Sequence, residues 1–192
     1  MPIFPNNFKT LADNLMTFIN DPKNREIMQN ISNAITDAFK NNRKVLICGN
    51  GGSACDAVHF AEEFTGRFRK NRPALPVIAI SDSAHITCVG NDFGFDHIFS
   101  RAVDAYIQPG DILVGISTSG NSQNVINAFN SAKNKSALTF ALLGKDGGKI
   151  KNTCDFELII PGDTTDRIQE IHMLILHSII EEVERQLFPE LY

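Results

Sequence analysis

The sequence predicts an α/β fold, a doubly wound five-stranded parallel sheet preceded by two N-terminal helices. Five short apolar runs, each typical of a buried strand, alternate with helical or loop stretches; they are residues 44–48, 76–80, 112–116, 138–143 and 156–160. Such alternation indicates a parallel sheet that helices cover on both faces. Polar residues gather in the loops that follow these runs, and ligands of such sheets bind outside the carboxyl ends of the strands. We therefore expect the chemistry on one edge of the sheet.

Length and composition limit the possibilities further. At 192 residues the chain suits a single domain over 1–192, with a helical segment at 1–41 and the α/β core and last helix at 42–192. A net charge of −4 argues against a nucleic-acid-binding surface. The four cysteines form no CxxC pair, and no apolar run approaches the roughly 20 residues of a membrane span. We expect a cytoplasmic protein that binds neither nucleic acid nor membrane.

The segment before the first strand carries helical periodicity twice. Its apolar positions are Phe8, Leu11, Leu15 and Phe18, then Ile27, Ile31, Ile35 and Phe39. Asp21 and Pro22 separate the two stretches as a turn and a helix start. Because both helices precede the first strand, they cannot lie in a crossover within the sheet. We expect them to pack outside it, against the last helix or another subunit.

Residues 44–67, KVLICGNGGSACDAVHFAEEFTGR, read as a buried strand, a glycine-rich turn and a helix that Ser53 caps. Unpaired N–H groups at such a turn can hold an anionic or polyhydroxylated ligand. On the helix, His59 and Glu63 are four residues apart and share a face that points back toward the polar loop. The pair suits metal binding or proton transfer, and equally an ordinary surface contact.

The loop STSGNS, residues 117–122, follows the third strand and precedes a helix that begins near Ser122. Hydroxyl and amide groups converge there at a helix N-terminus, which suits a phosphate monoester. The Walker lysine is absent from this loop, so a nucleoside triphosphate is excluded as the ordinary ligand. A turn with an N-cap and no ligand explains the same residues.

The last helix, residues 166–187, carries Gln169, Met173 and His177 at four-residue intervals on one stripe. His172 lies about 140° around the helix from His177. His177 therefore belongs with Gln169. A histidine among so many apolar neighbours is also consistent with a purely structural core residue.

Together these motifs resemble the sugar isomerase (SIS) family. The segments that carry the resemblance are GNGGSACDAVHFAEEFTGRFRKNRP, AISDSAHITCVGNDFGF, GISTSGNSQNVI, GKDGG and DRIQEIHMLILH. The resemblance implies a flavodoxin-like strand order and a homotetramer with sites shared between subunits. It also implies an aldose-ketose isomerase that converts sedoheptulose 7-phosphate to D-glycero-D-manno-heptose 7-phosphate, a precursor of the heptose in lipopolysaccharide core.

Matched position by position, the resemblance implies roles for individual residues. Glu63 resembles the general base and His177 its acid/base partner. The implied ligands of one Zn²⁺ per subunit are His59, Glu63, Gln169 and His177. The implied substrate contacts are Asn50, Gly51, Gly52, Glu63, Asn91, Asp92, Ser117, Thr118, Ser119, Ser122 and Gln169.

The alternative is a non-catalytic protein of the same fold that binds a replication initiator. The closing stretch EVERQLFPELY resembles the end of that relative. Both Glu63 and His177 are present, however, and isomerisation needs a base and a second acid/base group beside the reacting carbons. This favours the enzyme. A carboxylate bound to zinc is a weaker base, so whether a metal here is catalytic, structural or mobile stays open.

Overall fold

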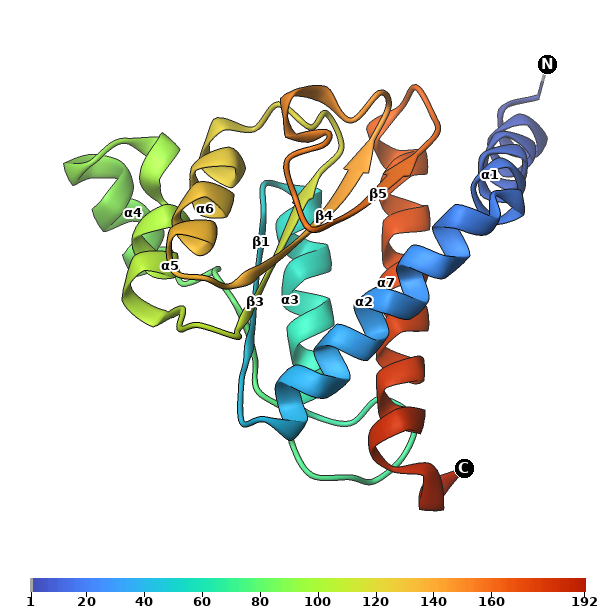
Figure 1. Ribbon diagram of the computed structural model, residues 1–192. Coiled ribbons are helices and arrows are strands. Elements are labelled where there is room, and N and C mark those ends of the chain that lie inside the picture. The colour runs from blue at the N-terminus through green and yellow to red at the C-terminus, as the bar shows by residue number, and fades with distance from the viewer. Residues whose placement is uncertain (1) are drawn as a thin grey trace.

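The structure, a computed structural model, describes residues 2–192 and places one parallel sheet between two layers of helices (Figure 1). The strands are β1 (Val45–Gly49), β2 (Val77–Ala79), β3 (Ile112–Ser117), β4 (Leu138–Gly144) and β5 (Phe156–Ile160). Their order is β2-β1-β3-β4-β5 and every pairing is parallel, which confirms the doubly wound prediction. The order reverses between β1 and β3, so the loops that follow these two strands flank the switch point where such folds bind ligands.

The helices divide between the two faces of the sheet. One face carries α1 (Ile3–Asn20), α2 (Pro22–Lys40), α3 (Gly52–Thr65) and α7 (Thr165–Leu187), and the other carries α4 (Ser83–Asp92), α5 (Ser100–Tyr106) and α6 (Gln123–Asn134). Successive strand residues alternate between the two cores: Val45 and Ile47 face the first layer, Leu46 and Cys48 the second. Burial on both faces explains why the strands read as continuous apolar runs.

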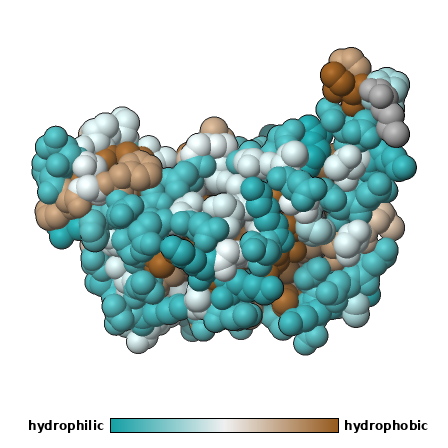
Figure 2. Space-filling model, turned by 90° about the horizontal axis from the view of Figure 1, so that it is seen from above, coloured by the Kyte–Doolittle hydropathy of each residue, from teal (hydrophilic) through white to brown (hydrophobic). Residues whose placement is uncertain are grey.

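The two N-terminal helices pack outside the sheet, as predicted, and α2 lies along α7 (Figure 1). The Asp21 side chain caps α2 by accepting from Lys23 N at 2.9 Å, with Pro22 in the first turn. Phe18 is buried against the core, whereas Phe8 is 71% exposed. Figure 2 accordingly shows apolar atoms standing clear at the N-terminal end of α1.

Ser53 is not the cap of α3, contrary to the sequence prediction. The helix begins at Gly52, and its N-cap is Gly51 with φ +58°, two residues before the predicted cap. Gly51 adopts this left-handed conformation without the steric cost that a side chain would bring. Ser53 instead points inward and is buried, where its hydroxyl accepts from Gln169 Nε2 at 3.3 Å.

Among residues 2–192, we find no helix that combines the length and the apolar character needed to cross a membrane. The four cysteines are free thiols in this structure.

Candidate functional site

The side chains of His59, Glu63 and His177 meet on the outer surface where α3 packs against α7. One ligand atom from each lies within 4.8 Å of the other two. His59 Nε2 is 3.3 Å from Glu63 Oε1, and the two imidazole centroids are 4.9 Å apart at 80°. The structure therefore brings together three of the four predicted metal ligands, which we call the triad.

Burial and neighbouring charge favour the neutral form of His177. Desolvation lowers its pKa first, and the charges of His59 and Arg69 lower it further, while Glu63 acts in the opposite direction. Phe68 stacks on the imidazole at 5.6 Å and 24° and covers part of it. A neutral imidazole can bind a metal or exchange a proton at neutral pH.

Asp56 is a titratable group that the sequence reading missed. It lies one turn before His59 on α3 and is half-buried. Burial raises the pKa of its carboxyl group to about 6, although His59 acts to lower it. The signal was present in the sequence, because Asp56, His59 and Glu63 are spaced three and four residues apart and so share one helix face.

A second group of predicted residues lies at the other end of α3, around the glycine-rich turn. Gln169 packs so closely on Gly52 that a Cβ added there would lie 2.6 Å from its amide. Asn50 exchanges two side-chain hydrogen bonds of 2.9 Å with Asn124 of α6. The turn is thus joined to α7 on one side and to α6 on the other.

The serine loop, residues 117–122, lies beside this turn at the carboxyl edge of the sheet. Ser117 is buried, and its Oγ accepts from Gly120 N at 3.1 Å and lies 3.0 Å from Ser122 Oγ. Ser122 is the N-cap of α6, although its side chain makes no capping hydrogen bond. Ser119 and Thr118 are only partly buried. Hydroxyl groups and the start of α6 therefore converge, as predicted for a phosphate site.

The loop GKDGG, residues 144–148, supports the serine loop from behind. A Cβ added at Gly120 would overlap Gly147 O, and one added at Gly148 would overlap Ser119 O. Ile150 N donates to Gly120 O at 3.0 Å and ties the two loops together. In this structure the GKDGG motif acts through close backbone packing, which only residues without a side chain permit.

The triad and the serine loop lie apart within one chain. Since a helix rises 1.5 Å per residue, Glu63 is about 16 Å along α3 from Gly52, and His177 is about 12 Å along α7 from Gln169. The expectation that all the chemistry sits on the carboxyl edge is therefore wrong for the triad. The sequence predicts that the face of His59 and Glu63 points toward the polar loop, but α3 runs back across the sheet, away from the loop that starts it. Gln169 contacts Ser53 in one chain, and its role as a metal ligand stays a prediction.

Asn91 and Asp92, which the resemblance matched to substrate contacts, are the last two residues of α4. Both are exposed, and Asn91 Nδ2 donates to Asp92 Oδ1 at 2.7 Å. They lie on the opposite face of the sheet from the triad. Their role in substrate binding stays a prediction.

The donor atoms of the triad fit a divalent metal such as zinc. Imidazole nitrogen and carboxylate oxygen are ligands that Zn²⁺ takes in proteins. The Nε2 atom of His177 is also buried without a hydrogen-bond partner among the described residues. A buried polar atom without a partner is costly, and a bound metal would satisfy it.

Comparison with known proteins places this chain in a family. The family model described as SIS domain matches residues 7–144. The chain belongs to the SIS domain family. Among curated SIS relatives, the phosphoheptose isomerase of Fusobacterium nucleatum is 59% identical, over 96% of this chain and 95% of the relative. That of Escherichia coli is 51% identical, over 95% of each.

Solved SIS structures agree in fold. A phosphoheptose isomerase from Francisella tularensis superposes with a TM-score of 0.89 at 35% identity, covering 95% of this chain and 96% of that one. The phosphoheptose isomerase from Neisseria gonorrhoeae gives 0.83 at 38% identity, covering 94% of each. The predicted family and fold are confirmed.

Proposed function

We propose that this chain is an aldose-ketose isomerase that converts sedoheptulose 7-phosphate to D-glycero-D-manno-heptose 7-phosphate. The observation that carries the proposal is the meeting of Glu63 and His177, a carboxylate and a neutral imidazole, on a chain whose relatives named phosphoheptose isomerase match nearly its whole length. The non-catalytic alternative lacks such support, because it gives the pair no role.

The reaction moves two protons, and the chain offers one group for each. Glu63 removes a proton from C1 of the ketose and returns it to C2 after an enediol forms. His177 carries the hydroxyl proton from O1 to O2, so that the carbonyl is lost at C2 and formed at C1. A lowered pKa suits this second role, because a neutral imidazole both accepts and donates at neutral pH.

We propose one Zn²⁺ per subunit, held by His59, Glu63 and His177, with Gln169 as the predicted fourth ligand. When bound, the ion would polarise the sugar's oxygens as a Lewis acid. The chain's own residues orient the ligands: the helical spacing sets His59 against Glu63, and Phe68 packs over His177. The triad's donor set supports a metal without saying whether it is catalytic or structural.

The serine loop is the proposed phosphate site, with the turn at Asn50, Gly51 and Gly52 and the α4 residues Asn91 and Asp92 as further substrate contacts. Since about 16 Å of α3 separates the turn from Glu63, we propose that one copy of the chain supplies the phosphate loop and another the triad. Val58 and Leu174, which flank the triad, are 43% and 47% exposed, as an interface between copies would require. A homotetramer with shared sites accounts for both observations.

We further propose, from the resemblance to the family, that the heptose phosphate product serves as a precursor of lipopolysaccharide core heptose. Four free thiols are consistent with a reducing, cytoplasmic compartment.

The test is an assay of the purified protein with sedoheptulose 7-phosphate, with and without added zinc, together with metal analysis and light scattering. We expect aldose product, about one zinc per chain and a tetramer mass. His59→Ala should reduce the zinc content. Absence of product at any zinc concentration would overturn the isomerase assignment, full activity after chelation would make the metal dispensable, and a monomer mass would overturn the shared site.

A further inference from the structure

The side chain of Arg72 is fully buried, and its hydrogen bonds join the end of α3 to α7. Its Nε donates to Glu184 Oε1 at 2.8 Å, and neither side chain is exposed. Its two other nitrogens donate to the carbonyl oxygens of Glu63 at 2.7 Å and Phe64 at 2.6 Å. The guanidinium therefore holds the backbone of Glu63 itself, one of the residues of the triad.

The partner of Arg72 is held in turn by a third residue. Tyr192 donates from its hydroxyl to Glu184 Oε2 at 2.6 Å, so both carboxylate oxygens are occupied. Burial and the neighbouring Glu184 raise the pKa of Tyr192 to about 12, which keeps the hydroxyl protonated. Arg185 lies 4.2 Å from the centre of the Tyr192 ring. We call Arg72, Glu184 and Tyr192 the latch.

Stability alone does not explain a buried ion pair of this kind. Replacing such a pair with apolar residues of similar volume is often neutral or stabilising. What the arginine adds is geometry, because its planar fork fixes several acceptors at once in a way that a lysine cannot. Glu184 lies seven residues after His177 and therefore on the same side of α7.

We propose that the latch is a positioning device, which fixes α3 and α7 along their axes at the register where Glu63 and His177 meet. The contact of Gln169 with Ser53 ties the same two helices together at their other end, so the triad lies between two ties. The catalytic consequence rests on the proposed function. The effect of the latch on the positions of the triad's side chains does not depend on the proposed function.

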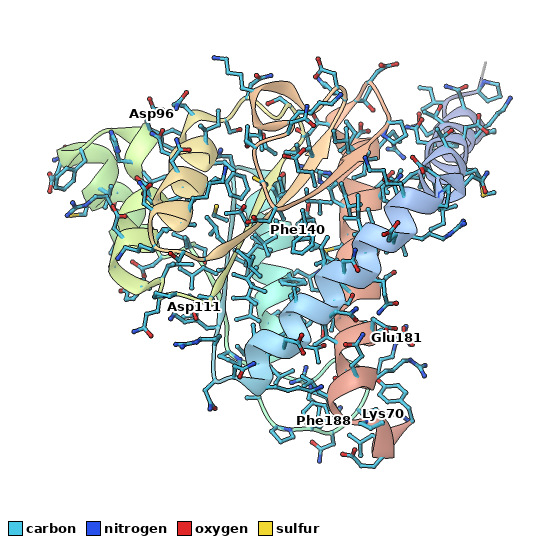
Figure 3. All side chains as sticks on the ribbon, viewed as in Figure 1. Lys70, Asp96, Asp111, Phe140, Glu181 and Phe188 are labelled. Atoms are coloured by element: carbon cyan, nitrogen blue, oxygen red, sulfur yellow. The ribbon has the colours of Figure 1, made fainter. Side chains whose placement is uncertain are left out.

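The decisive experiment compares two matched substitutions, Glu184→Gln and Asp111→Asn. Asp111 is also a buried carboxylate in an ion pair, 2.5 Å from Lys44 Nζ, but it lies on the far side of the molecule from α7 (Figure 3). Both changes remove one buried charge while keeping the side-chain shape. We expect both to lower the melting temperature, and only Glu184→Gln to weaken Co²⁺ or Zn²⁺ binding and lower kcat, each by roughly tenfold or more, with little change in KM.

One further readout keeps the proposal testable whatever the enzyme does. The ring ¹⁵N signals of His59 and His177 report the triad without metal or turnover, and we expect them to shift in Glu184→Gln and not in Asp111→Asn. If the wild-type protein shows no isomerase activity, the proposed function fails while these signals still decide the latch.

Tyr192→Phe is the milder variant, since it removes one hydroxyl and keeps the ring. We expect a smaller shift of the same histidine signals, and it replaces Glu184→Gln as the test should that variant not fold. Arg72→Lys keeps the positive charge but loses the planar guanidinium, so we expect it to shift the same histidine signals. Unchanged signals in the folded variants, or equal changes in Asp111→Asn, would overturn the latch and leave Arg72 and Glu184 as structural residues only.

Discussion

The two ends of α3 carry candidate binding groups of different construction. At its start, the serine loop and glycine-rich turn present hydroxyl and backbone groups, held by neighbouring loops that pack without side chains. Toward its other end, the triad consists of side chains from two helices that meet only because the sheet topology sets α3 beside α7. The residues of the loop and turn are adjacent in short sequence motifs, whereas those of the triad meet only through tertiary packing. Substitutions should therefore affect turnover at one end and substrate affinity at the other.

The largest effect is expected at Glu63. Glu63→Gln keeps the volume of the side chain but cannot accept a proton from carbon at neutral pH. A lost general base costs roughly 10²- to 10⁴-fold in turnover, about 3 to 5 kcal/mol of barrier. Steady-state kinetics should show this fall in kcat while the melting temperature stays near that of the wild type.

The neighbouring Glu62 is the control. Its side chain is 61% exposed, lies 100° around the helix and comes no closer than 3.8 Å to His59 Nε2, so Glu62→Gln should change kcat little. Near-full activity of Glu63→Gln, or loss of activity in Glu62→Gln instead, would refute the assignment of the base.

At the other end of α3, the double change of Ser119→Ala and Ser122→Ala should raise KM. A hydrogen bond to a charged group contributes about 1.5 to 3 kcal/mol, so each lost contact weakens binding roughly tenfold or more. Ser119 and Ser122 are only partly buried, and we expect a much smaller effect on the melting temperature. An unchanged KM for the sugar phosphate would show that this loop does not hold the phosphate.

The loop packing itself is tested by Gly120→Ala against Gly94→Ala. Both glycines have positive φ, +63° and +90°, so both substitutions strain the backbone. Only at Gly120 does the added methyl group overlap a neighbouring backbone, whereas Gly94 has open space. Urea unfolding should show Gly120→Ala less stable than Gly94→Ala by about 1 to 3 kcal/mol, the usual cost of overpacking. Equal losses would mean that the two loops separate easily.

The smallest effect concerns the other histidine of α7, His172, which is buried and hydrogen-bonded to Leu143 O at 2.9 Å. Burial lowers its pKa from 6.5 to about 4. Below pH 6.5 the unfolded chain therefore takes up a proton at His172 that the folded chain excludes. The free energy of unfolding is thus unaffected by His172 above pH 6.5 and falls as the pH drops toward 4.

The titration of His172 changes the free energy of unfolding by at most about 1.4 kcal/mol per pH unit. Urea unfolding of wild type and His172→Gln at pH 6.5 and 5.5 measures it, and the variant should lose about 1 kcal/mol less. Other titrating groups, Asp56 among them, are common to both proteins and cancel in the difference. Parallel loss in the two proteins would show that His172 does not titrate as its burial predicts.

Local spacing could predict much of this structure, and packing between distant elements could not. The apolar runs predicted all five strands, and the four-residue spacing predicted the contact of His59 with Glu63. Ser53 was misassigned because serine is a common N-cap, while here a glycine with positive φ, Gly51, is the N-cap and Ser53 turns inward to Gln169. Arg72 gave no signal, since its acceptors are backbone carbonyl groups and a glutamate more than 100 residues away.

The packing of α2 on α7 has a consequence for the synthesis of the chain. The ribosome makes α2 early and α7 last, so the part of α2 that packs against α7 lacks this partner until roughly 125 further residues have been added. At 5 to 20 residues per second, that interval is roughly 6 to 25 s. We therefore expect part of the apolar side of α2 to stay exposed during translation, and the packing of α2 against α7 to form only after this last long helix has been made.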